Sequence, residues 1–177
     1  MSPTTATRAH PLIQVDLDSV AFVADWQHCD HLANYLSRLA SFDRADTFFY
    51  ANLLSTVLNE LLEIVFFEHD PEGGELSCTL LRDGAVDRVE LLIPVDDQRR
   101  GFYERGVEEA QSPCAAEIYT QALLGEKNSR RALGLLELAS DYGANVALQP
   151  ATDGRRLCLS VEVRLEDARS PKSSALP

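Results

Sequence analysis

Two glutamates on one predicted helix are the residues whose types and spacing best fit chemistry. Glu60 and Glu63 belong to the segment NELLEI at 59–64, near the end of a long stretch whose apolar residues recur at helical spacing. A carboxylate there can act as a general base when a hydroxyl group or a water lies within hydrogen-bonding distance. Glu60 and Ile64 are one turn apart, so they share one helix face. The alternative is a solvated glutamate on the polar face of an amphipathic helix, where Glu is a favoured residue.

Two arginines at the start of a later predicted helix form a second candidate site. Arg130 and Arg131 could meet a phosphate there with the help of the helix dipole. The alternative is a pair of exposed arginines in an otherwise acidic protein. Asn128 and Ser129 are good N-cap residues, which explains their presence without any ligand.

Two further groups have side chains of metal-binding type. His28, Cys29, Asp30 and His31 are adjacent, but a zinc site would need distant partners that the sequence does not identify. The pair at 96–97 consists of aspartates that follow a predicted strand, and such pairs more often cap the next helix than bind a metal. We therefore predict no metal site.

The cysteines indicate neither a disulfide framework nor a zinc site. Cys29, Cys78, Cys114 and Cys158 are far apart and form no CxxC pair. Cys78 and Cys158 have apolar, strand-like neighbours and are predicted to be small core residues. There is also no P-loop and no recognisable Ser-His-Asp or Cys-His arrangement, which argues against P-loop and classical hydrolase chemistry.

The composition predicts one globular domain in the cytoplasm. The 177 residues are 45% hydrophobic and 25% charged, as in an average globular protein of this size. The formal net charge of -12 argues against nucleic acid or an anionic membrane as a partner, because both repel an acidic surface. Neither a membrane span of roughly 18 apolar residues nor a signal peptide is recognisable, and a reducing compartment fits the cysteines.

The positions of turn-forming and apolar residues predict the order of the elements. We expect flexible ends at 1–11 and 168–177, which flank a single domain at 12–167. Apolar periodicity predicts an edge strand or hairpin at 12–23 and helices at 26–42, 46–67 and 129–142, the last closed by Gly143. The region 98–125 is predicted to be helical with a break at Ser112-Pro113.

The remaining segments are predicted to be strands: 75–81, 87–95, 145–149 and 156–165. Asp83 and Gly84 between the first two favour a hairpin turn. This order indicates an α+β fold, a two-layer sandwich with helices on one face of a mixed, mostly antiparallel sheet.

Three local motifs, within residues 12–166, resemble the GHKL (Bergerat) fold of histidine-kinase-like ATPases. The segment NELLE at 59–63 resembles the N-box, and ALGLLEL at 132–138 followed by DYGA at 141–144 resembles the later Gly-Leu-Gly-Leu segment. The third motif, WQHCD at 26–30, resembles the opening of the first helix in SiaB-like proteins. The chain is most similar to the small bacterial regulatory branch that contains anti-sigma-factor kinases and SiaB-like serine kinases.

This resemblance implies roles for particular residues. Glu60 would be the catalytic base, and Gly134 with Arg130 or Arg131 would meet the phosphates of ATP. Ile64 stands where the family has the magnesium-binding Asn, and a hydrocarbon is no ligand for a hard cation. Glu63 is the residue best placed to take over that role. The Asp-x-Gly-x-Gly motif expected after residue 95 and the glycine-rich lid before residue 133 are missing. ATP and magnesium are thus the cofactors implied by the family, and these departures weigh against them.

The resemblance therefore predicts a bacterial signalling regulator with degenerate nucleotide motifs. It would act by protein–protein binding in a partner-switching system, and its partner would be a regulatory protein with a phosphorylatable Ser. The alternative is an active ATP- and magnesium-dependent serine/threonine kinase of SiaB or anti-sigma-factor type. A similar fold with an unrelated small-molecule pocket is a third interpretation. A homodimer is compatible with all three.

Overall fold

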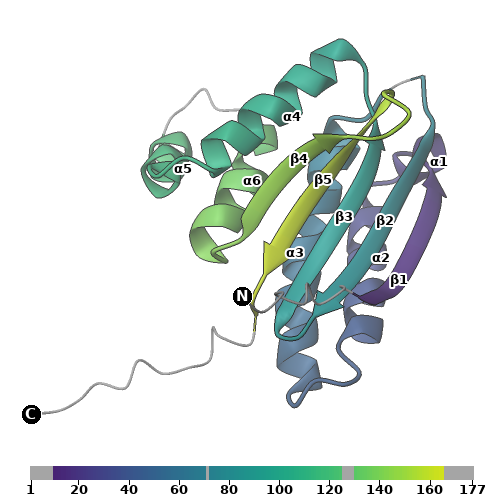
Figure 1. The fold of residues 1–177 in the computed structure, drawn as a ribbon, viewed down its shortest axis with the longest axis vertical. Coiled ribbons are helices and arrows are strands. Elements are labelled where there is room, and N and C mark those ends of the chain that lie inside the picture. Colours follow the sequence, from purple (N-terminus) through teal and green to yellow (C-terminus); the bar gives the residue numbers. More distant parts are fainter. Residues whose placement is uncertain (1–9, 71, 125–129, 166–177) are drawn as a thin grey trace, which may run out of the picture.

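The computed structural model describes residues 10–70, 72–124 and 130–165, and it has two layers, a sheet and a set of helices (Figure 1). In chain order the elements are β1 (His10–Asp18), α1 (Ser19–Phe22), α2 (Gln27–Ala40), α3 (Thr47–Phe67), β2 (Glu75–Asp83), β3 (Val86–Pro94), α4 (Asp97–Ala110), α5 (Ala115–Leu124), α6 (Arg130–Asp141), β4 (Asn145–Pro150) and β5 (Arg156–Val163). The predicted α+β fold class is confirmed.

The sheet has five strands in the order β1-β2-β3-β5-β4. Every neighbouring pair is antiparallel, so the parallel component of the predicted mixed sheet is wrong. Side chains alternate between the faces as strand geometry requires: on β3, Val89, Leu91 and Ile93 are buried, while the residues between them are half-buried on the opposite face. The sheet therefore has one core face and one more open face.

Helices α2, α3 and α6 lie behind the sheet in the view of Figure 1 and cover its core face. α3 is the central one. Asp46 caps its N-terminus by accepting a hydrogen bond from the Phe49 backbone N–H at 3.0 Å. By length and composition alone α3 could also cross a membrane. Its apolar side chains, from Tyr50 to Val65, instead belong to the domain core. The core helix of a globular protein also meets these criteria of length and composition.

Helix α4 packs at the β4 end of the sheet, against α6 (Figure 1). Tyr103 is fully buried, and Gly106 lies so close to α6 that an added Cβ atom would be 3.1 Å from Leu135 Cδ1. Gln111 ends the helix and donates a side-chain hydrogen bond to the Val146 carbonyl of β4 at 2.8 Å. These contacts attach α4 to both layers.

Several predicted features of the chain are confirmed in place. The β2–β3 turn contains Gly84 at φ +59°, and Gly143 follows α6 at φ +60°, a left-handed backbone conformation that glycine adopts without strain. The break at Ser112-Pro113 separates α4 from α5. Residues 1–9 and 168–177, where flexible ends are predicted, lie outside the described part of the chain.

Two predictions on the strands are wrong. The edge strand predicted within 12–23 is confirmed as β1, but it begins at His10, within the segment expected to be flexible, and the residues after Asp18 form the short helix α1 and not a second strand of a hairpin. Asp18 causes this change by accepting a hydrogen bond from the Ala21 N–H at 2.8 Å, as an N-cap does. Cys78 is a core residue as predicted, but Cys158 is half-buried on the open face, because its neighbours Leu157 and Leu159 occupy the core-facing positions of β5.

Candidate functional site

Helices α3 and α6 bring together Glu60, Ile64 and Gly134, three residues that the sequence separates. An added Cβ atom on Gly134 would lie 2.9 Å from Ile64 Cδ1, 3.1 Å from Ile64 Cγ1 and 3.4 Å from Glu60 Oε2. Ile64 and Gly134 are buried, while Glu60 is half-buried. The glycine thus permits the two helices to meet, and its missing side chain leaves room for Ile64.

The carboxyl group of Glu60 lies in an unusual electrostatic environment. Partial burial raises its pKa from 4.5 to about 7, and the carboxylates of Glu137 on α6 and Glu63 on α3 add to the rise. A pKa near neutrality allows a carboxyl group to accept and release protons at physiological pH, which is the property required of a general base. The same surroundings oppose the approach of an anion.

Two tyrosines face the same acidic side chains. Burial, followed by Glu137, Asp141 and Glu60, raises the pKa of Tyr119 on α5 to about 12. Burial and Glu137 likewise raise the pKa of Tyr142, which follows α6. We call Glu60, Glu137, Asp141, Tyr119 and Tyr142 the α3–α6 acidic cluster. Within it, the phenol groups remain protonated and available as hydrogen-bond donors at neutral pH.

Glu63 lies on the side of α3 that faces α2. Its Oε1 accepts a hydrogen bond from Asn59 Nδ2 at 2.6 Å. The thiol of Cys29 on α2 is close enough that burial and then the Glu63 charge raise its pKa to about 12. Glu63, the residue considered as a substitute for a magnesium-binding Asn, is therefore hydrogen-bonded to a neighbour on its own helix.

The arginines predicted to meet a phosphate lie only partly within the described chain. The backbones of Arg130 and Arg131 form the first turn of α6, but their side chains, and the whole of Asn128 and Ser129, are outside the described residues. Their proposed contact with a phosphate remains a prediction.

The other candidates have structural roles. Asp96 caps α4 by accepting a hydrogen bond from the Arg99 N–H at 2.8 Å, which lowers its pKa, so the predicted capping role is confirmed. His28 Nδ1 contacts the Phe22 carbonyl oxygen at 2.9 Å, and Cys29 is buried. Within the ranges 10–70, 72–124 and 130–165, no group of three or more His, Cys, Asp or Glu side chains is arranged to hold a metal ion.

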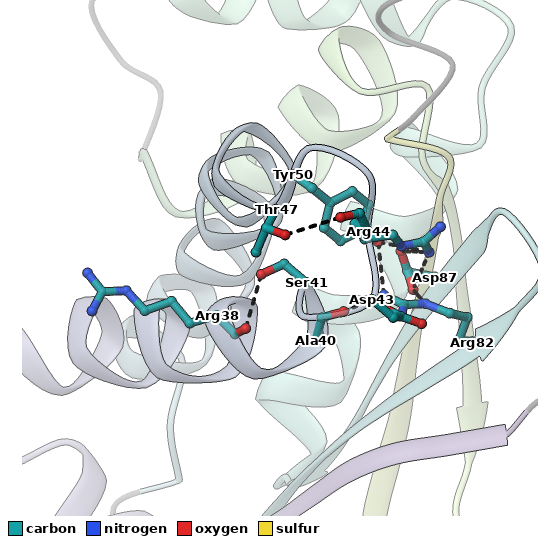
Figure 2. A network of polar contacts seen from close by, with 9 residues as sticks. All are labelled: Arg38, Ala40, Ser41, Asp43, Arg44, Thr47, Tyr50, Arg82 and Asp87. Atoms are coloured by element: carbon teal, nitrogen blue, oxygen red, sulfur yellow. Dashed lines mark hydrogen bonds and ion pairs between the residues drawn. The ribbon is translucent and has the colours of Figure 1, made fainter.

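Sequence reasoning missed a buried ionic network where the α2–α3 turn meets the β2–β3 hairpin (Figure 2). The side chain of Asp87 is fully buried and pairs with Arg44 at 3.2 Å and with Arg82 at 2.8 Å. Both guanidinium groups also lie over the Tyr50 ring, 4.5 Å and 5.7 Å from its centroid. The only sequence signal is the pair Arg82 and Asp87 on either side of a predicted hairpin turn, since Arg44 is distant in the chain.

This network supports the fold and has no feature of a reactive site. Arg82 additionally donates to the Ala40 carbonyl at 2.7 Å and pairs with Asp43 at 2.6 Å, so it connects β2 to the end of α2. Its guanidinium group therefore donates to acceptors within the protein, the Ala40 carbonyl and the carboxylates of Asp43 and Asp87.

A chain in the crystal structure of the SiaB–SiaC complex from Pseudomonas aeruginosa has a similar fold. The match has a TM-score of 0.54 and 16% sequence identity, and it covers 87% of this chain and 90% of that chain. No protein-family model and no curated protein sequence matches the chain. At this level of identity the likeness supports a SiaB-like fold and the two-layer architecture, and leaves the chemistry to be argued from the residues.

Proposed function

We propose that this protein is a signalling regulator that acts by binding a regulatory protein, and that its GHKL-type fold has altered or lost magnesium–nucleotide chemistry. The observation that carries the proposal is the contact between Ile64 and Gly134. In the family that the motifs resemble, these positions serve magnesium and phosphate. In this structure the two residues contact each other instead, and α3 packs closely against α6 at that point.

Magnesium and ATP fit the described residues poorly. Ile64 offers a hydrocarbon where magnesium needs oxygen, and Glu63, its nearest substitute, is already hydrogen-bonded to Asn59. Glu60 places a carboxyl oxygen beside the glycine that would have to approach a phosphate, and Glu137 adds negative charge near Glu60.

Protein binding is the function that we favour when nucleotide chemistry is set aside. The similar structure is described as a complex of two proteins, SiaB and SiaC. The fold and the acidic charge of -12 are compatible with a comparable role, in which a regulatory protein with a phosphorylatable Ser is bound.

One observation favours the rival function, a serine/threonine kinase. Glu60 has a pKa of about 7, the value expected of a working general base and unusual for a surface glutamate. Burial together with neighbouring carboxylates at a contact between helices produces the same shift without catalysis, so the pKa alone does not decide between the two functions.

Nucleotide titration separates the two proposals. Thermal unfolding is followed with millimolar ATP plus magnesium, and with ATP plus a chelator as the control. We expect no stabilisation. A ligand at about a hundred times its dissociation constant would stabilise the fold by roughly 2.7 kcal/mol. A magnesium-dependent rise in melting temperature that Glu60→Gln or Gly134→Val removes would refute the regulator proposal.

Partner binding is tested with SiaC-like proteins encoded in the same genome. Purified pairs are mixed without nucleotide, and binding is measured by calorimetry. We expect at least one pair to associate with no ATP present. Failure of every such protein to bind, or transfer of labelled phosphate to one of them in a parallel mixture with labelled ATP and magnesium, would contradict a purely binding role.

A further inference from the structure

Two Asp-Gly pairs occupy hairpin turns at opposite ends of the sheet. Asp83 and Gly84 lie in the β2–β3 turn, and Asp153 and Gly154 lie in the β4–β5 turn (Figure 1). All four residues are exposed. Both glycines have a positive φ, +59° and +68°, and a Cβ atom added to either would meet nothing within 4 Å. The two pairs are therefore alike in sequence, in exposure and in glycine conformation.

An Asp-Gly pair can rearrange without an enzyme. The backbone nitrogen of the glycine attacks the carboxyl carbon of the aspartate, a C–N bond forms, and the carboxyl hydroxyl leaves with the amide proton as water. Water then opens the resulting five-membered succinimide ring. Cleavage at the former backbone carbonyl yields isoaspartate, in which the chain continues through the side-chain carbons. Glycine favours ring closure because it has no side chain to obstruct the ring. One water is released and one is taken up, so no further reactant is required.

Both reacting groups of the β4–β5 pair are engaged in hydrogen bonds. Asp153 Oδ1 accepts from the backbone N–H groups of Arg155 and Arg156 at 3.0 Å and 3.1 Å, and Oδ2 accepts from Arg156 Nε at 2.7 Å. The Gly154 N–H donates to the Ala151 carbonyl at 2.9 Å. The bonds from the Arg156 side chain and the Arg155 backbone also lower the pKa of Asp153. This carboxyl group therefore stays ionised, which is its less reactive form.

The β2–β3 pair lacks such restraints. Among the residues that the structure describes, none donates a hydrogen bond to the Asp83 carboxyl group, and none accepts one from the Gly84 N–H. Asp83 is the last residue of β2, so rotation about its backbone bonds disturbs only the tip of the hairpin. The carboxyl carbon and the amide nitrogen can therefore meet without the loss of a described contact.

We propose that Asp83 is a site of spontaneous isoaspartate formation in the folded protein, and that the hydrogen bonds of the β4–β5 turn protect Asp153 from the same reaction. The modified chain is then a substrate for carboxyl methyltransferases that recognise isoaspartate. This goes beyond the proposed regulatory function and does not depend on it, since none of the residues of the α3–α6 acidic cluster is involved.

The modification affects a buried ion pair. Arg82 and Asp87 are opposite each other on β2 and β3, one position inside the turn, and their side chains pair at 2.8 Å (Figure 2). Isoaspartate at position 83 adds one atom to the backbone between them. A two-residue turn fixes the register of its hairpin, so the added atom shifts Arg82 relative to Asp87 and weakens their pairing.

Peptide mapping of the full chain tests the proposal. The folded protein is kept for several weeks in mildly acidic buffer, where more of each exposed carboxyl group is protonated, and is then digested and analysed by chromatography and mass spectrometry. We expect the fragment with residues 83–84 to yield one product lighter by a water, the succinimide, and one isomer of unchanged mass. A purified isoaspartyl methyltransferase with labelled S-adenosylmethionine should methylate that isomer. Residues 153–154 should be modified about tenfold less or lower still, because several hydrogen bonds must break first.

The unfolded chain separates the effect of the fold from that of the sequence. In urea the hydrogen bonds around Asp153 are lost, and the two pairs should be modified at similar rates. Asp83→Glu is the matched control, since it keeps the charge but would have to close a six-membered ring, which forms far more slowly. Incubation should lower the melting temperature of the original protein and leave that of this variant unchanged.

Four results would overturn the proposal or one of its parts. An unmodified Asp83 in the folded protein would refute the site, and equal modification of both pairs in the folded protein would refute protection of Asp153. A difference between the pairs that persisted in urea would assign it to the local sequence and not to the fold. A modified hairpin with an unchanged melting temperature would refute the effect on Arg82 and Asp87.

Discussion

Ile64 of α3 and Gly134 of α6 are in such close contact that a single added carbon atom on the glycine would lie 2.9 Å from Ile64 Cδ1. Real Cβ atoms do not approach other atoms so closely without some displacement. Ile64 is only 3% exposed, and its side chain has little room to move. The contact explains why glycine occupies the middle of a helix, where it is otherwise unfavourable.

The first prediction is that Gly134→Ala destabilises the protein. A glycine-to-alanine change inside a helix normally stabilises it by about 1 kcal/mol. Overpacking a closed contact costs about 1–3 kcal/mol. We therefore expect a net loss of about 1 kcal/mol in the free energy of unfolding, measured by urea denaturation.

Ile64→Ala and Gly101→Ala are the controls for this prediction. Removal of the Ile64 contacts should make Gly134→Ala stabilising by up to about 1 kcal/mol in that background, so the two sites are coupled. Gly101 in α4 faces only the flexible end of Arg105, at 3.3 Å, and its change to Ala should stabilise the protein. If Ile64→Ala and Gly134→Ala instead changed the free energy of unfolding additively, the contact with Ile64 would not be the reason that Gly134→Ala is destabilising.

The second prediction concerns Glu60 and pH. Its pKa rises from 4.5 in the unfolded chain to about 7 in the folded protein, so the folded state holds the proton more tightly. Stability should therefore fall as the pH rises from 4.5 to 7. Glu60→Gln should stabilise the protein above pH 7 by about 1 kcal/mol, once partial exposure of the carboxyl group is taken into account. The difference should vanish towards pH 4.5.

Carbon-13 NMR of the Glu60 carboxyl group provides an independent measurement. We expect a midpoint of about 7. Glu137→Gln should lower this midpoint, because the Glu137 carboxylate raises the pKa of Glu60 more than the Glu63 carboxylate does. A midpoint near 4.5 in the unmodified protein would show that the carboxyl group is solvated.

The third prediction is that a single thiol reacts rapidly in the native protein. Cys114 is exposed, while Cys29 and Cys78 are buried and burial raises the pKa of each to about 12. Only the thiolate is nucleophilic, so burial and a raised pKa both suppress reaction. A colorimetric thiol reagent at pH 8 should titrate one fast thiol, which Cys114→Ser removes, and all four in urea. Rapid loss of a second native thiol would point to Cys158.

Most of the architecture could be predicted because its signals are local. Asp46 followed by helical apolar periodicity predicts α3, and Asp83-Gly84 between two apolar runs predicts the β2–β3 hairpin. Where a local signal was ambiguous, the prediction failed: the apolar residues after Asp18 fit a short strand as well as the helix that Asp18 caps. The alternation of residues along β5 separates the two faces of the strand, but it does not indicate that Cys158 lies on the open face of the sheet.

The site depends on contacts that no local pattern contains. The motif at 59–63 identified Glu60, but its raised pKa requires Glu137, which only the packing of α6 on α3 brings near. The same packing determines what Gly134 touches. Glu63 was considered as a metal ligand from its position on the helix, and its hydrogen bond to Asn59 was not foreseen.

The last prediction concerns Asp87, whose fully buried carboxylate pairs with two arginines (Figure 2). The side chains of Arg44 and Arg82 are only 9% and 10% exposed, so loss of their shared counter-charge leaves positive charge in a poorly solvated place. Removal of one partner of a buried pair typically costs about 3–5 kcal/mol. Asp87→Asn should therefore lower the free energy of unfolding by about this amount in urea denaturation.

Asp43→Asn is the control: Asp43 also pairs with Arg82, but its side chain is 67% exposed, and its loss should cost less than about 1 kcal/mol. Equal effects of the two substitutions would mean that water reaches Asp87 and that the network contributes little to the junction between the α2–α3 turn and the sheet.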